Sequence, residues 1–188
     1  PTNGIIYGSI STASGVVKAF RIKNSATLPR ATTIATNNPL YTVGNFNTNT
    51  KKPAALLADA ITILSGNWSD SRSSQALSQR TATATQVNAS YMTGNSETGA
   101  SGHSYNGGFE NLVRFLENWD GTAFTWRGSA VALWYSRQTD GEISGSFYSP
   151  PNRDWAFDTD LLDVTKLPPG TPMVNIVQKS QWSQTFGN

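Results

Sequence analysis

The chain has 188 residues, a net charge of +2 and one histidine, and only 14% of its residues are charged. This length suits one domain with a real core, while the absence of cysteine excludes disulfides and leaves no usual His/Cys zinc site. Scattered lysines and arginines argue against nucleic-acid binding, and no apolar run approaches the ~20 residues of a membrane span.

The first part of the chain predicts short strands that end at turns. Residues rich in β-branched and aromatic side chains predict strands over 5–10, 16–22, 31–35 and 40–43. Gly-Asn pairs at 44–45, 66–67 and 94–95 follow apolar runs, and both residue types tolerate left-handed backbone. A turn that recurs every roughly 20–30 residues is typical of stacked coils. Unrelated strands that end in ordinary turns are the alternative.

Residues 54–64 form the longest apolar run in the sequence. Its length is compatible with a helix, but Ile61, Thr62 and Ile63 favour a strand that is buried on both faces. Asp59 is the exception in this run. A buried carboxylate needs donors, so we expect it to bind a turn amide or Arg30. A short helical turn near Ala76 and a further strand over 87–92 follow.

The segment 109–119 predicts an amphipathic helix. Apolar residues stand at positions 109, 112, 113 and 116, and Glu110 and Arg114 are spaced as an i,i+4 ion pair. We expect four side chains to anchor this helix on the body: Phe109, Leu112, Leu116 and Trp119.

The C-terminal part predicts strands over 123–127 and 129–135, followed by a proline-rich tail. We expect residues 149–188 to lie extended on a body formed by residues 1–148, pinned by Arg153, Trp155 and Phe157. The predicted fold is therefore a single, mainly β domain over 1–188. It is a short irregular β-solenoid, β-helix-like, with one packed helix and an extended C-terminal tail.

Few residues point to catalysis. His103 stands alone in a loop, and no Gly-x-Ser-x-Gly motif positions a nucleophile. Glu110 and Glu117 would lie about 10 Å apart along one helix, at 1.5 Å per residue, and suggest no cleft. We therefore expect no enzyme activity, no catalytic residue and no cofactor.

One acidic cluster is a candidate calcium site. Asp154, Asp158 and Asp160 supply the hard oxygen ligands that Ca²⁺ prefers, with Asp163 close by. Their spacing does not match an EF-hand loop, and an ion pair with the adjacent Arg153 is the simpler explanation. We expect no metal here.

Aromatic side chains offer a second kind of binding. Five tryptophans could stack on sugar rings, with core packing or cation–π contacts as the alternative. Trp134, inside an apolar strand, is expected in the core. These five residues are Trp68, Trp119, Trp126, Trp134 and Trp155.

An ordered series of motifs runs from Leu28 onward. The motifs are Leu-Pro-Arg at 28–30, Asn-Pro-Leu-Tyr-x-x-Gly-Asn-Phe-Asn at 38–47, Lys-Pro-Ala-Ala-Leu-Leu-Ala-Asp-Ala at 52–60, Leu-Ser-x-Asn-Trp at 64–68, Gly-Gly-Phe-Glu-Asn at 107–111, Arg-Phe-Leu-Glu-Asn-Trp at 114–119, Arg-Gly-Ser at 127–129, Tyr-Ser-Pro-Pro-x-Arg-Asp-Trp-x-Phe-Asp at 148–158 and Leu-Pro-Pro-Gly-Thr-Pro at 167–172. In this order they resemble the C-terminal region of bacterial PilX-like type IV pilus-assembly proteins, which are minor pilin-like.

The resemblance implies a structural role at the cell surface. The expected function is that of a globular subunit of an extracellular, type IV pilus-like filament or its accessory complex. Its partners would be a pilin-type helix, supplied by another chain or removed from this one, or further copies of itself. The alternatives are a cell-surface adhesin domain that binds glycans and, less favoured, a solenoid enzyme acting on polysaccharides.

Overall fold

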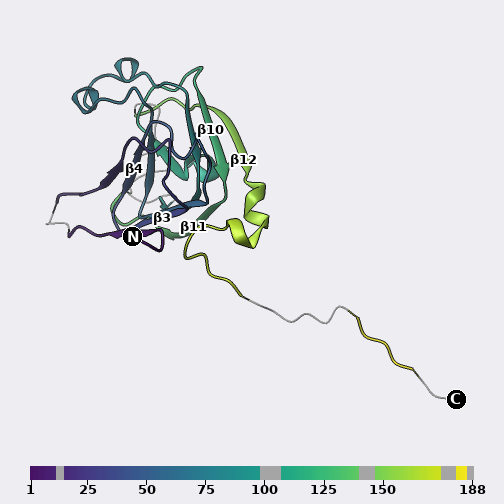
Figure 1. Ribbon diagram of the computed structural model, residues 1–188. Coiled ribbons are helices and arrows are strands. Elements are labelled where there is room, and N and C mark those ends of the chain that lie inside the picture. The colour runs from purple at the N-terminus through teal and green to yellow at the C-terminus, as the bar shows by residue number, and fades with distance from the viewer. Residues whose placement is uncertain (12–14, 98–106, 140–146, 175–180, 186–188) are drawn as a thin grey trace.

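The computed structural model describes residues 1–11, 15–97, 107–139, 147–174 and 181–185, which form three parallel β-sheets (Figure 1). In spatial order, sheet A contains β1 (Ile5–Gly8), β3 (Thr32–Thr36), β5 (Ala54–Ala58), β8 (Ser90–Asn95) and β11 (Ala130–Tyr135). Sheet B contains β2 (Phe20–Ile22), β4 (Leu40–Val43), β6 (Ile61–Leu64) and β9 (Val113–Phe115). Sheet C contains β12 (Asn152–Phe157), β10 (Ala123–Gly128) and β7 (Thr85–Asn88).

The helical elements are short 3-10 turns, which lie in the loops between strands or after the last strand, β12. They are η1 (Asp70–Arg72), η2 (Leu77–Gln79), η4 (Gly108–Asn111), η5 (Thr159–Leu162) and η6 (Val164–Lys166). Each has three or four residues, so the described part of the chain contains no longer helix.

The predicted fold class is wrong. A short irregular β-solenoid with a packed helix and an extended tail is replaced by three parallel sheets joined by loops and 3-10 turns. The segment 109–119 contains the end of η4 and strand β9 in place of a helix. The predicted tail over 149–188 begins with β12, which pairs with β10 through six residues.

Burial explains why residues 113–119 form no helix. Val113, Phe115, Glu117 and Trp119 are buried, while the residues between them are only half-buried. This alternation has the period of a strand. The charged Glu117 occupies an inward position, which hid the alternation and left a helical spacing of apolar residues as the stronger signal.

The apolar run 54–64 divides into β5 and β6 at a corner. Asp59 and Ala60 separate the two strands, which lie in sheets A and B. The core lies between the sheets and draws on all three, with Leu56 from sheet A, Ile61 from sheet B and Val87 from sheet C each fully buried. These strands are apolar because they border that shared core.

Asparagines satisfy the backbone at another corner. The Asn47 amide donates to the carbonyl of Asn88 (2.8 Å), and the Asn88 amide donates to the carbonyl of Asn47 (2.9 Å). Asn47 adopts φ +59°, a left-handed conformation that asparagine tolerates. These direct hydrogen bonds join the turn after β4 to the turn after β7 and satisfy backbone carbonyl groups at both.

The chain that follows β12 turns back along the outer face of sheet A. Lys51 holds Asp158 at the start of this return (2.7 Å), and the Thr33 hydroxyl donates to the carbonyl of Pro169 (2.6 Å). Met173 and Val174, which follow Pro172, are exposed, and Figure 1 shows the chain leaving the body at this point.

Candidate functional site

Strand β11 is an apolar, exposed strand at one edge of sheet A. Its sequence, Ala-Val-Ala-Leu-Trp-Tyr, carries no charge and no proline, and every residue after Ala130 is exposed. The exposed fraction is 63% for Leu133 and 60% for Tyr135. On one side β11 pairs with β8, and no strand of the described residues pairs with its other side. We call this free side the β11 edge.

The backbone of β11 presents alternate residues to its two sides. The Ser129 carbonyl accepts a hydrogen bond from the Tyr91 N–H (2.7 Å), so residues 129 and 131 face β8. In a parallel strand, the N–H and C=O groups of one residue point to the same side of the strand, and those of the next residue point to the opposite side. Ala130 and Ala132 therefore turn their backbone donors and acceptors toward the β11 edge.

A buried carboxylate fixes the end of β11. Asp59 accepts hydrogen bonds from the Ser136 hydroxyl (2.6 Å) and from the N–H groups of Arg137 (2.8 Å) and Gln138 (2.9 Å). The prediction that Asp59 binds turn amides is confirmed. Arg30, the other partner considered, instead donates to the carbonyl groups of residues 1 and 2.

The opposite edge of sheet A is also open. Strand β1 pairs with β3, and no described strand lies on its other side. Ile6 and Tyr7 are 44% and 68% exposed. Parallel pairing places one residue of each strand in a continuous row on the outer face. This outer row consists of Tyr7, Ala35, Leu57, Met92 and Val131.

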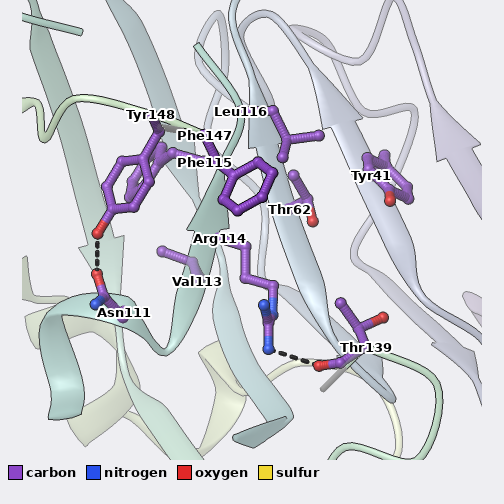
Figure 2. Close-up of a pocket in the computed structure, with 10 residues that line it drawn as sticks. All are labelled: Tyr41, Thr62, Asn111, Val113, Arg114, Phe115, Leu116, Thr139, Phe147 and Tyr148. Atoms are coloured by element: carbon purple, nitrogen blue, oxygen red, sulfur yellow. Dashed lines mark hydrogen bonds between the residues drawn. The ribbon is translucent and has the colours of Figure 1, made fainter. Parts of the chain in front are cut away.

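A separate pocket of about 220 Å³ lies over sheet B (Figure 2). Tyr41, Thr62 and Arg114 occupy matching positions on β4, β6 and β9. Phe147 and Tyr148 also line the pocket. Dashed lines in Figure 2 mark the hydrogen bonds from Tyr148 to Asn111 and from Arg114 to the Thr139 carbonyl. Aromatic rings beside polar groups could hold the face and hydroxyls of a sugar ring.

Glu117 is the other buried carboxylate. It accepts hydrogen bonds from the N–H (2.6 Å) and the hydroxyl (2.7 Å) of Ser65. Burial raises the pKa of Glu117 above its ordinary value, and the two bonds from Ser65 oppose that rise. This pair ties β9 to the corner that follows β6, so its role is structural.

The predicted anchors of a helix are dispersed among strands and turns. Trp119 is fully buried against Phe115 and Phe124, and Leu112 is also buried. Leu116 lines the pocket in Figure 2. Phe109 is exposed, although its ring contacts Trp126 and Trp155.

The residues predicted to pin the tail lie on the edge strand β12. Arg153 places its guanidinium 5.4 Å from the centre of the Trp155 ring and pairs with Glu110 (3.5 Å). The expected Glu110–Arg114 pair is thus replaced by a contact between η4 and β12. Trp155 is half-buried, whereas Phe157 is exposed.

The candidate calcium ligands bind cations of the protein. Asp154 forms a two-oxygen pair with Arg127 (3.0 Å to each oxygen), while Asp158 and Asp160 both contact Lys51 (2.7 Å). No group of three or more potential metal ligands lies together in the described ranges. Arg153, the ion-pair partner expected for this cluster, instead pairs with Glu110.

The tryptophans do not gather on one exposed face. Trp119 and Trp126 are buried, and Trp155 packs at a right angle against Trp126. Trp68 donates to Asp70 in the loop that contains η1. Trp134, expected in the core, is instead exposed on β11, and no feature of that apolar run distinguishes a buried strand from an open edge. His103 lies outside the described residues.

Comparison with known proteins adds no relative to this picture. No family model matches the chain, and no curated protein or solved structure matches it. No helix within the described ranges is long and apolar enough to span a membrane.

Proposed function

We propose that this chain is a structural subunit of an extracellular filament of the type IV pilus kind, or of its accessory complex, and works by associating with other protein chains. The observation that carries the proposal is the β11 edge, an uncharged strand of six residues with a free backbone side. The resemblance to PilX-like proteins supplies the cell-surface context. Other copies of the chain, or a pilin-type helix, are the partners.

The physical argument rests on what an open edge does. Soluble proteins usually protect edge strands with lysine, proline, bulges or a covering segment, because free N–H and C=O groups recruit other strands. Residues 130–135 contain neither lysine nor proline. The one device of this kind is a β-bulge between Ala132 and Tyr135, which leaves residues 130–132 in regular register with β8. A partner strand would satisfy the backbone groups and cover Leu133 and Tyr135.

The glycan-binding alternative has weaker support. Its site would be the pocket in Figure 2, where Tyr41 and Phe147 stand beside Arg114. The aromatic cluster that it predicted on one surface lies mostly inside the protein, around Trp126 and Trp119.

Replacement of Ala132 by proline tests the proposal. Proline removes the N–H of residue 132, which faces the β11 edge, and leaves the bonds to β8 in place. We expect the wild-type protein to form linear assemblies in negative-stain images and to sediment as a concentration-dependent series of oligomers. Ala132→Pro should remain monomeric under the same conditions.

The matched control is Ala132→Ser, which retains the N–H and changes little volume. It should assemble like the wild type, and both variants should unfold within a few degrees of it. Monodisperse wild-type monomers at high protein concentration would overturn the structural role. Equal assembly by the proline and serine variants would show that the β11 edge does not carry it.

A further inference from the structure

We infer that the β11 edge binds strand β1 of the next copy, parallel and in register, so that sheet A continues from one molecule into the other; this inference rests on the proposed function. The occupant of the edge is therefore a second copy of this chain, and the contact is head-to-tail.

The two free edges of sheet A are suited to each other. They lie at opposite sides of the same sheet, and all five strands run in the same direction. If a copy is translated along the direction in which the strands stack, its β1 lies beside β11. The two strands then run parallel, as does every existing strand pair of sheet A. A two-fold axis would instead set β11 against β11 in antiparallel orientation. Translation thus extends the pattern that already holds the sheet together.

The path of the C-terminal segment leaves this contact open. After β12, residues 158–172 turn away from the β11 edge and cross the outer face of the sheet. Thr33 binds Pro169 there, and a Cβ at Gly170 would lie 3.0 Å from Ile5. These contacts lie on the face of β1 and β3, not in the plane in which a further strand would pair.

The existing register predicts which residues meet. The outer row begins at Tyr7 and ends at Val131, so Val131 of one copy faces Tyr7 of the next. The inner row begins at Ile6 and ends at Ala130, passing through buried Leu56 and Tyr91. Neither β1 nor β11 contains a charged residue, so the pairs bring together apolar side chains without charge repulsion. A shift by one residue would reverse the faces.

Single cysteines provide a direct test because the chain has no cysteine of its own. Neighbouring strands lie ≈ 4.8 Å apart, a Cα separation that a disulfide can bridge. Four variants, each with one cysteine, are prepared: Tyr7→Cys, Val131→Cys, Ile6→Cys and Ala130→Cys. They are mixed in pairs, oxidised with copper phenanthroline and separated on non-reducing gels.

Two mixtures match the inferred register and two do not. Tyr7→Cys with Val131→Cys, and Ile6→Cys with Ala130→Cys, should give covalent dimers. The crossed mixtures, Ile6→Cys with Val131→Cys and Tyr7→Cys with Ala130→Cys, should lose them, because those side chains face opposite sides of the sheet. Each variant alone should remain monomeric on the gel, and circular dichroism should match the wild type.

The outcomes separate this inference from the proposed function. Linear assemblies without a dimer in the matched mixtures would overturn the β11–β1 contact and leave the structural role standing. Efficient cross-linking of Val131→Cys with itself would overturn the head-to-tail arrangement in favour of a two-fold one. Failure of the wild type to assemble at all would remove both.

Discussion

At the scale of single residues, two buried carboxylates organise corners of the fold. Asp59 accepts three hydrogen bonds from the turn after β11, and Glu117 accepts two from Ser65. Each acid joins segments more than fifty positions apart in the sequence. Removal of either would leave buried donors without acceptors, which costs about 1–3 kcal/mol for each donor.

Glu117 should make stability depend on pH. The ordinary pKa of a glutamate, 4.5, applies to Glu117 in the unfolded chain, and burial raises the pKa of Glu117 in the folded protein. The folded state therefore binds more protons than the unfolded chain between pH 4.5 and the raised pKa. The contribution of this group to the free energy of unfolding therefore falls as pH rises through that window. Glu117→Gln does not titrate and should lack this slope. Urea unfolding of both proteins from pH 4 to 7 measures the difference, and parallel curves would contradict the assignment.

At the scale of elements, the corners were harder to predict than the strands. The limits of β4 were predicted as Leu40–Val43, and the turn near Ala76 corresponds to η2. Where an apolar run crosses a corner, the sequence predicts one strand, as for residues 54–64 and 87–92, because buried corners keep the apolar pattern. Only Asp59 signalled the first break, and nothing comparable marks Ala89.

The prediction of a helix over 109–119 is wrong for a different reason, the presence of a charged residue inside the protein. Helical spacing of Phe109, Leu112 and Leu116 matched a template, while the true period of two was interrupted by a charged inward residue. A buried glutamate is rare enough that sequence patterns treat it as a surface residue. The candidate site was missed similarly, because an apolar strand is expected inside and β11 lies at an edge.

The corner between β10 and β11 should tolerate no side chain. A Cβ at Gly128 would lie 2.0 Å from the carbonyl oxygen of Ala89, which also accepts a hydrogen bond from Trp126 (2.8 Å). We expect Gly128→Ala to lower the free energy of unfolding by roughly 1–3 kcal/mol or more.

The matched control is Gly121→Ala, in a turn with φ +68° and open space around the position. Only the strain of left-handed backbone opposes alanine there, at a cost of roughly 1–2 kcal/mol. Denaturant titrations of the two variants compare them directly. A smaller loss at Gly128 than at Gly121 would show that the close approach to Ala89 is not rigid.

At the scale of the whole molecule, sheet A has two different ends. One end presents four residues of β1 and the other presents six residues of β11. A contact between unlike ends that repeats by translation does not close on itself and permits open-ended growth. Lone open edges of this kind are a source of aggregation in most proteins, and the contact inferred above would pair them with copies of the same chain.

The Ala132→Pro variant should therefore inhibit assembly of the wild-type protein when the two are mixed. The variant retains β1 and can join the β11 edge of a growing assembly, but its own edge accepts no further copy. We expect small fractions of it to shorten assemblies in proportion to the amount added, as measured from lengths in negative-stain images. Ala132→Ser at the same fractions should leave the length distribution unchanged, and equal shortening by both would contradict this mechanism.

Because the two edges of sheet A are chemically different, any such array has a direction. Its extremities could never be equivalent: one would show Tyr7 and the other would show Leu133 and Tyr135. A root and a tip would thus be distinguishable to an antibody, an anchoring factor or an export machine without any additional protein to label them.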